Sequence, residues 1–236
     1  TSLNKSTEFK NFIKESEGKP ILISSAPYKH LPVASTALKD SVSKKLNLLR
    51  FLEDTRSKPI LDLKVRRQHS YVEDYGSMSK SQRSKALTSD SFDIDKDYVK
   101  GKALIILDDV KITGAHEQRM RSLLQSSGFT GPVIYVYFAE FISKGDPSIE
   151  NYLNYYNLDI GLLSIDNLIS NEDFILNTRV CKYILGCELE MFKIFIHSKT
   201  TAFKETLLDG AIRNGYLEVP EFNENLTYLK TQLPFS

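Results

Sequence analysis

The chain has no excess of either charge and no long hydrophobic run. Its 236 residues include 31 Lys and Arg against 30 Asp and Glu, which gives a formal net charge of +1. This balance gives no basis for tight, nonspecific binding to nucleic acid or to an anionic membrane. The longest apolar run, Pro132 to Phe138, is far too short to span a bilayer. No basic stretch with an apolar core opens the segment, so we expect a cytoplasmic protein without a secretory signal.

Cysteine is also scarce, with only Cys181 and Cys187 in the chain. They lie six residues apart in a helical pattern, and at 3.6 residues per turn they point to well-separated faces, which argues against a local disulfide. No histidine stands at ligand spacing beside them, which argues against zinc. We interpret both as small buried hydrophobic residues in a reducing compartment.

What the chain does contain is the composition of a soluble globular protein. Hydrophobic residues make up 41% and charged residues 26%, which excludes intrinsic disorder and a fibrous repeat. The length suits one large domain, or a domain with an appendage, and allows a sizeable core.

Apolar runs, each rich in branched or aromatic residues, predict four buried β-strands. They are Ile21–Ile23, Ile60–Val65, Ala103–Leu107 and Val133–Phe138. Helical patterns separate them, one beginning near Pro32 and another ending near Gly128. Continuous apolar strands alternating with helices are typical of a parallel sheet covered on both faces. The sequence therefore predicts an α/β domain over residues 1–165.

A long polar stretch, Arg66–Lys100, separates the second and third predicted strands. A connection of this length without an apolar period is usually a mobile functional loop or a disordered linker. Its surroundings are basic, because Lys and Arg outnumber Asp and Glu between Asp62 and Lys85. Taken alone, these residues favour a solvated surface loop over an anion-binding lid.

From Asp166 onward the pattern becomes purely helical, which predicts a helical C-terminal appendage over residues 166–236. Two apolar stripes run along Val180–Ile196, so we expect one helix that is covered on two sides. The second cover would come from later helices or from another copy of the chain, which allows a homodimer. Acidic residues outnumber basic ones in this appendage, ten against seven.

The most informative segment runs from Gly101 to His116. A buried strand delivers Asp108 and Asp109 at its carboxyl end, and a short loop containing Thr113-Gly114 opens directly into a helix. Backbone N–H groups of this loop and the helix N-terminus can hold a phosphate, while the paired carboxylates can accept hydrogen bonds from vicinal sugar hydroxyls. The alternative is that both acids merely cap a strand-to-helix turn. Their place at the carboxyl end of a parallel strand favours ligand binding.

The run Ile106-Leu107-Asp108-Asp109-Val110 with Thr113-Gly114-Ala115 resembles the phosphoribosyl-diphosphate (PRPP) signature of the type I phosphoribosyltransferases. The order Arg66-Arg67, Arg83, Phe92, Gly101-Lys102 and then this signature is similar to that of the ComF-like members. The resemblance covers residues 20 to 140 and leaves the helical appendage unexplained. It implies a reaction in which PRPP, with Mg²⁺, gives its ribose 5-phosphate to a nitrogenous base and releases diphosphate.

The resemblance also implies roles for individual residues. Asp108 and Asp109 would hold the ribose 2- and 3-hydroxyls. The 5-phosphate would lie against the loop formed by Lys111, Ile112, Thr113, Gly114, Ala115 and His116. The diphosphate loop would comprise Ser25, Ala26, Pro27, Tyr28 and Lys29. A hood carrying Arg66, Arg67, Tyr71 and Arg83 would close over the site, and in this context we favour the anion-binding lid.

This sequence departs from the family pattern at several positions. Ile112 stands where relatives offer a hydroxyl, or an acid that manages the proton of the base. His116 stands where relatives have Thr or Ser; it can donate to the phosphate, or it is a surface histidine at a helix start. The diphosphate loop lacks the glycine common in relatives. No Ser-His-Asp or Cys-His arrangement is readable, so nucleophilic catalysis is not supported.

Three functions remain open at this point. The first is a PRPP-dependent enzyme, supported by the intact acids and the basic hood. The second is a PRPP- or nucleotide-sensing regulator that has lost turnover, favoured by Ile112 and the unusual diphosphate loop. The third is an interaction subunit whose acidic appendage contacts a basic partner. We expect the appendage to help form the acceptor pocket, with Asn177, Arg179 and Lys182 as candidate contacts, but the sequence does not identify the acceptor base.

Overall fold

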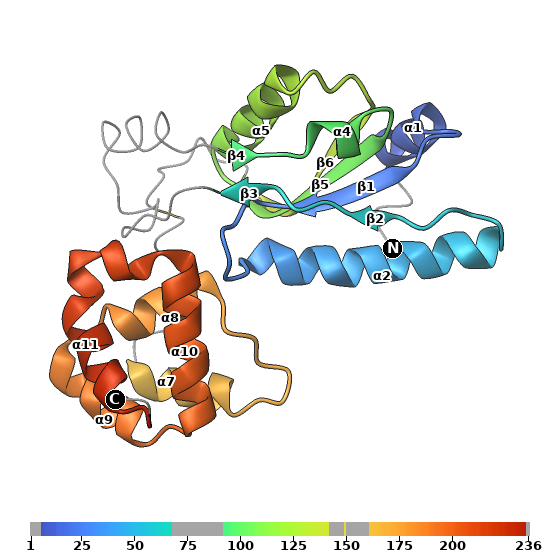
Figure 1. Ribbon diagram of the computed structural model, residues 1–236. Helices are drawn as coiled ribbons and strands as arrows, with labels where there is room; N and C mark the ends of the chain where they lie inside the picture. Colours follow the sequence, from blue (N-terminus) through green and yellow to red (C-terminus); the bar gives the residue numbers. More distant parts are fainter. Residues whose placement is uncertain (1–5, 68–91, 142–148, 150–160, 235–236) are drawn as a thin grey trace. The chain divides into compact units, whose positions relative to one another are not determined.

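The computed structural model describes residues 6–67, 92–141, 149 and 161–234. These residues form two compact units (Figure 1). The first comprises residues 6–27, 34–67 and 92–141, and the second comprises residues 28–33, 149 and 161–234. The short segment 28–33 thus belongs to the second unit, although both of its neighbours in the chain belong to the first.

A four-stranded parallel sheet forms the centre of the first unit. Its order is β2-β1-β5-β6. The strands are β1 (Ile21–Ser25), β2 (Leu61–Asp62), β5 (Ala103–Lys111) and β6 (Val133–Glu140). A separate antiparallel pair joins β3 (Arg66–Arg67) to β4 (Phe92–Asp93). The predicted α/β fold with a parallel sheet is confirmed.

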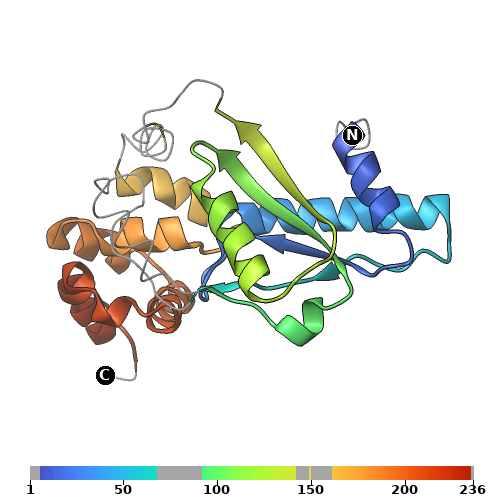
Figure 2. The same cartoon turned by 90° about the horizontal axis from the view of Figure 1, so that it is seen from above.

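Helices cover both faces of this sheet, with α2 and α5 on opposite sides (Figures 1 and 2). The helices of this unit are α1 (Thr7–Glu15), α2 (Ala34–Glu53), α4 (Lys96–Val99) and α5 (Ala115–Ser126). Because successive strand side chains point to opposite faces, β1 and β5 supply two cores. One core packs Ile23 and Ile105 against α1 and α2, and the other packs Leu22 and Leu104 against α5. This double burial explains why the strands read as unbroken apolar runs.

The second unit is a helical bundle. Its helices are α7 (Leu162–Ile169), α8 (Thr178–Leu185), α9 (Leu189–His197), α10 (Thr201–Asn214) and α11 (Asn223–Thr231), with short 3₁₀ helices at Tyr216–Glu218 and Pro220–Phe222. Its core contains Ile184, Phe192, Leu207 and Tyr216, all fully buried. Leu31 from segment 28–33 belongs to the same core and is 5% exposed.

The single helix predicted over Val180–Ile196 is wrong, because the structure breaks it into α8 and α9. The Asn225 side chain donates to the carbonyl oxygens of Leu185 and Cys187, both at 2.8 Å. Glu188 then caps the start of α9. A buried amide from a distant helix therefore replaces the hydrogen bonds that a continuous helix would have made.

Both cysteines are free thiols. Cys181 is fully buried in the helical core, and burial raises the pKa of its thiol to about 12. Cys187 is half-buried just after α8, and burial raises its pKa to about 11. Neither thiol therefore has the depressed pKa of a reactive cysteine. Among the described residues, no helix combines the length and the hydropathy needed to cross a bilayer.

Candidate functional site at the carboxyl end of β5

Strand β5 is longer than the sequence predicts, and this places both acids within the strand. The expected end at Leu107 is the last residue that pairs with β1, where it lies opposite Ser25. Beyond that point β5 continues beside β6, with Asp108 opposite Tyr137 and Lys111 opposite Glu140. The two strands therefore extend together past the end of β1.

The two carboxylates occupy different sides of this extension, because neighbouring side chains of a strand point to opposite faces. Asp108 lies on the α5 side, where its Oδ2 is 3.4 Å from His116 Nδ1, and its side chain is 13% exposed. Its Oδ1 accepts a hydrogen bond from the Asp109 backbone N–H at 3.0 Å. The Asp109 carboxylate accepts from the Val110 N–H at 2.9 Å. These local bonds hold both carboxylates in place, and a carboxylate oxygen can accept more than one hydrogen bond.

The turn that follows joins β5 to α5 through Ile112, Thr113 and Gly114. Gly114 has φ = +73°, a left-handed conformation that glycine adopts without steric cost, and it forms the N-cap of α5. Exposed Thr113 accepts a hydrogen bond from the Ala115 N–H at 3.4 Å. The first turn of α5 therefore starts one short turn after the strand that carries the acids, and its N–H groups and dipole favour an anion there.

An ionic cluster that the sequence analysis did not identify anchors this turn. Glu117 in the first turn of α5 accepts from Arg121 at 2.7 and 2.9 Å and from the Tyr137 hydroxyl at 2.9 Å. Lys111 Nζ lies 3.3 Å from Glu117 and 3.4 Å from Glu140. The four-residue spacing of Glu117 and Arg121 is the one sequence signal that could have revealed part of it.

The cluster sets the charge of its members. Burial opposes ionisation of Glu117, but hydrogen bonds from Arg121, Tyr137 and Lys111 outweigh it, and the pKa of the carboxyl lies below its ordinary value. The hydrogen bond to Glu117 raises the pKa of Lys111, with smaller contributions from Glu140. Burial raises the pKa of Tyr137, and its bond to Glu117 raises it further. Glu117 is therefore ionised, and the positive charges of Lys111 and Arg121 balance its negative charge. This balance reduces its repulsion of an anion at the start of α5.

The predicted diphosphate loop is divided between the two units. Ser25 is 3% exposed, its hydroxyl lies 3.4 Å from that of Thr36, and the Ala26 N–H donates to Ser35 Oγ at 3.2 Å. This first part, which ends at Pro27, belongs to the α/β unit. Tyr28 and Lys29 belong to the helical unit.

The helical unit holds the continuation of this loop through several hydrogen bonds. Asn214 Oδ1 accepts from the backbone N–H groups of His30 and Leu31, each at 3.1 Å. Thr178 donates its hydroxyl to the Leu31 carbonyl at 3.0 Å and its N–H to the Pro32 carbonyl at 2.9 Å. The segment is therefore an integral part of that unit.

A buried lysine, Lys39 of α2, also lies in the α/β unit and was not singled out by the sequence. Its ammonium is 2.8 Å from Asp40 and 3.0 Å from Asp62, and the residue is 7% exposed. Burial lowers its pKa, but the two carboxylates outweigh this effect and the pKa lies above its ordinary value. Because two carboxylates already neutralise the Lys39 ammonium, and one of them belongs to β2, we assign Lys39 a structural role that joins α2 to β2.

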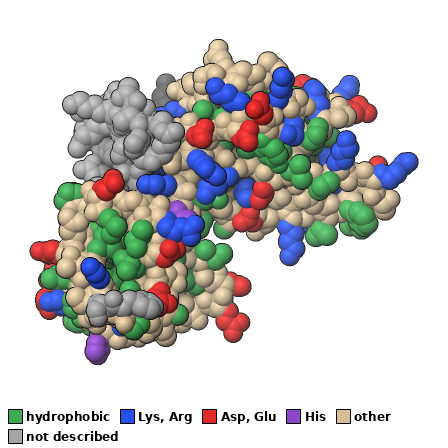
Figure 3. Space-filling model, viewed as in Figure 1, with side chains coloured by type: hydrophobic (Ala, Val, Ile, Leu, Met, Phe, Trp, Pro, Cys, Tyr) green, Lys and Arg blue, Asp and Glu red, His purple; other side chains and the backbone are tan. Residues whose placement is uncertain are grey.

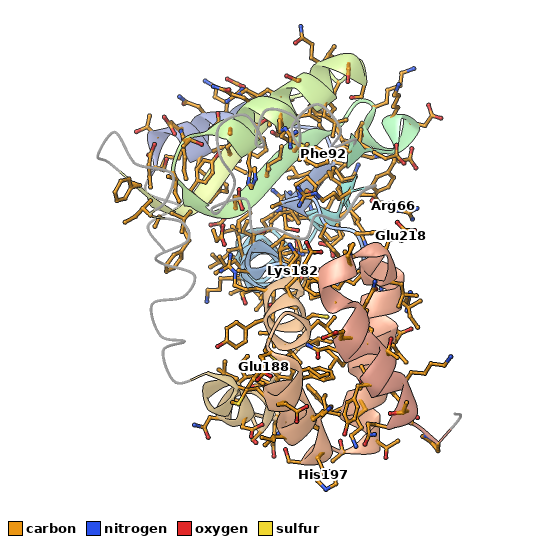
Figure 4. All side chains as sticks on the ribbon, turned by 90° about the vertical axis from the view of Figure 1, so that its left-hand side faces the viewer. Arg66, Phe92, Lys182, Glu188, His197 and Glu218 are labelled. Carbon is orange, nitrogen blue, oxygen red and sulfur yellow. The ribbon has the colours of Figure 1, made fainter. Side chains whose placement is uncertain are left out.

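The remaining predicted residues divide into those that the structure describes and those that it does not. Arg66 and Arg67 lie on β3, opposite Asp93 and Phe92 of β4. Arg66 and Phe92 are labelled in Figure 4. Tyr71 and Arg83 lie outside the described residues, so the predicted hood stays a prediction. In the helical unit, Asn177 is the N-cap of α8 and accepts from two backbone N–H groups of its first turn. Its carboxamide oxygen is therefore already used within its own helix.

The resemblance implies that Mg²⁺ takes part at this site. Within the described residues, no group of three or more His, Cys, Asp and Glu side chains is arranged to hold a metal ion. Mg²⁺ commonly binds through substrate phosphates, water and only one or two carboxylates. The two acids of β5 are compatible with an ion that arrives on a diphosphate.

Comparison with known proteins gives one finding that covers most of the chain. The family model described as PRTase ComF-like matches residues 3–229. It therefore includes the helical unit as well as the segment that carries the acids. A search of curated proteins found no match. The chain belongs to the ComF-like family of phosphoribosyltransferase (PRTase) domains.

Proposed function

We propose that this protein binds PRPP at the β5–α5 turn and transfers its phosphoribosyl group to a nitrogenous base with release of diphosphate. The observation that carries the proposal is the succession of Asp108, Asp109 and the left-handed Gly114 directly before the N-terminus of α5. Carboxylates next to an anion site match a ligand that carries hydroxyls beside a phosphate. Membership of a PRTase family supports this assignment.

In this proposal the residues of the turn bind and orient the sugar phosphate. Asp108 and Asp109 accept hydrogen bonds from the ribose hydroxyls, and their own backbone bonds hold them in place. The N–H groups of the turn from Ile112 to His116 bind the 5-phosphate in this proposal, and the exposed Thr113 hydroxyl adds a donor. His116, half-exposed and beside Asp108, adds a ring N–H on the same side.

The proposed reaction breaks the bond between ribose C1 and the diphosphate oxygen, which leaves with the electron pair. A nitrogen of the base forms the new bond to C1 and gives up its proton. Mg²⁺, which we propose arrives bound to PRPP, supplies positive charge that stabilises the leaving diphosphate. Ile112 has no group that can take the proton released by the base, so we expect this proton to pass to water or to the diphosphate.

A PRPP-sensing regulator is the second candidate, and Ile112 favours it for the same reason. A carboxylate or hydroxyl at that position could contribute to turnover. An isoleucine cannot, but it does not prevent PRPP from binding. The two candidates share the PRPP site and differ only in whether an acceptor base is used.

The deciding experiment is a screen for diphosphate release from PRPP and Mg²⁺ across bases and base-like amines. An enzyme should release diphosphate with at least one acceptor, and Asp108→Asn with Asp109→Asn should abolish that release. A matched control is Asp97→Asn with Glu17→Gln, which changes the same charge at exposed positions of the same unit. PRPP binding by the wild type without diphosphate release would favour the regulator. Diphosphate release that persists unchanged in the Asp108 and Asp109 variant would contradict the site.

A further inference from the structure

Glu117 at the start of α5 differs from the charged side chains at the surface of the α/β unit, because it is largely buried. On the face of this unit that Figure 3 shows, acidic and basic side chains are intermixed at the surface. Ion pairs at a surface contribute little to stability. The Glu117 side chain, in contrast, is only 16% exposed. Its contacts can therefore hold the first turn of α5 in a defined place.

The two oxygens of the Glu117 carboxylate bind different parts of the unit. Oε1 accepts from Nε and Nη2 of Arg121, one turn along the same helix, at 2.9 and 2.7 Å. Oε2 accepts from the Tyr137 hydroxyl at 2.9 Å and lies 3.3 Å from Lys111 Nζ. Oε1 therefore makes contacts within α5, whereas Oε2 joins α5 to strands β5 and β6.

Tyr137 is also the cross-strand neighbour of Asp108. His116, which directly precedes Glu117, places its Nδ1 3.4 Å from Asp108 Oδ2. Two adjacent residues of α5 thus contact two paired positions of the sheet. Burial and Glu117 raise the pKa of Tyr137 most, and the nearby charge of Asp108 raises it further. Together these contacts fix the start of α5 relative to Asp108.

We propose that Tyr137 is a positioning residue of the PRPP site. It acts through Glu117 and sets the separation between Asp108, which accepts from a ribose hydroxyl, and the turn that binds the 5-phosphate. A ligand that carries both groups binds well only when this separation matches its own. The role of Tyr137 rests on the proposed sugar-phosphate site but not on turnover, so it holds for an enzyme and for a regulator.

Tyr137→Phe tests this role, because it removes the hydroxyl that joins β6 to Glu117 and leaves the Arg121 contacts of Oε1 in place. In NMR titrations we expect the affinity for ribose 5-phosphate to fall about tenfold, as for the loss of a hydrogen bond to a charged group. The affinity for inorganic phosphate, which occupies only one end of the site, should stay at the wild-type value. An equal loss for both ligands, or an unchanged affinity for ribose 5-phosphate, overturns the positioning role.

Tyr135→Phe is the matched control. Tyr135 lies two residues earlier on the same face of β6, and its buried hydroxyl has no hydrogen-bond partner among the described residues. This variant should bind both ligands like wild type, and circular dichroism should show that both variants are folded. If Tyr135→Phe loses as much ribose 5-phosphate affinity as Tyr137→Phe, the bond to Glu117 is not the cause and the proposal is wrong.

The route through Glu117 is tested by repeating Tyr137→Phe in a Glu117→Leu background. Leucine cannot accept a hydrogen bond from the hydroxyl, so Tyr137→Phe should then have little effect on the affinity for ribose 5-phosphate. If Tyr137→Phe weakens binding equally in both backgrounds, Tyr137 does not act through Glu117.

The same titrations separate the positioning role from the proposed site. If wild type does not bind ribose 5-phosphate, or if Asp108→Asn with Asp109→Asn binds it like wild type, the site itself is wrong and the positioning role falls with it. If that double variant loses the ligand whereas Tyr137→Phe binds like wild type, the site stands and only the positioning role is wrong.

Discussion

Asn214 provides the sharpest test of how segment 28–33 is held in the helical unit. The residue is 3% exposed, and its Oδ1 accepts the backbone N–H groups of His30 and Leu31. Segment 28–33 connects β1 to α2 and begins within the predicted diphosphate loop. Asn214→Ala removes the acceptor from both groups, and we expect the segment to loosen.

The size of the effect follows from the burial of the two donors. Leu31 is 5% exposed, so its orphaned N–H costs about 1–3 kcal/mol, whereas water can partly replace the partner of half-buried His30. We therefore expect the helical unit to lose about 2–3 kcal/mol of unfolding free energy. Amide exchange at Leu31 should then be faster by roughly 30- to 150-fold, at tenfold per 1.4 kcal/mol.

Hydrogen exchange of residues 28–33, together with denaturant titration, measures both quantities. Asn214→Asp is the matched control, because it keeps an oxygen acceptor in the same place and should retain more protection at Leu31 than the alanine variant. Unchanged exchange at Leu31 in Asn214→Ala would refute the view that this side chain holds the segment.

Two further predictions concern the β5–α5 turn. Because the pKa of Glu117 is lower in the folded protein than its ordinary value of 4.5, its ionised carboxylate stabilises the fold at pH values above 4.5. This stabilisation disappears as the pH falls through the pKa of the folded state. Glu117→Gln should therefore be less stable than wild type at pH 7, and urea titrations should show the difference narrowing toward pH 3; a constant difference would contradict this. Gly114→Ala and Gly128→Ala both force alanine into a left-handed conformation, near +73° and +75°, at about 1–2 kcal/mol each. Calorimetry should show weaker PRPP binding only for the Gly114 variant. If both variants lose PRPP affinity equally, the β5–α5 turn does not bind the ligand in the way proposed.

The sequence predicts the sheet well because burial on both faces leaves a direct signature. Ile21–Ile23 and Ala103–Leu107 are apolar at every position, and each strand faces a helix on both sides. The extension of β5 through Lys111 was not predicted, because Asp108 and Asp109 interrupt the apolar pattern. Backbone pairing with β6, as far as Lys111 opposite Glu140, extends the strand beyond the point where its apolar side-chain pattern ends.

Other features depend on contacts between residues far apart in the chain. The break between α8 and α9 is hidden by apolar stripes that continue across Gly186, and it is made by Asn225, about 40 residues away. The membership of segment 28–33 in the helical unit depends on Asn214, which lies 183 residues beyond Leu31. Local propensity contains no record of such partners, so the sequence could not assign them.

Calorimetric titration of PRPP with Mg²⁺ tests the central claim most directly. Wild type should bind PRPP with a single site per chain. Asp108→Asn with Asp109→Asn should lose that binding while keeping wild-type thermal stability, because an amide replaces only part of the acceptor capacity of each carboxylate. The control variant, Asp97→Asn with Glu17→Gln, should bind like wild type. Unchanged affinity in the Asp108 and Asp109 variant, with native stability, would contradict the placement of PRPP at the carboxyl end of β5.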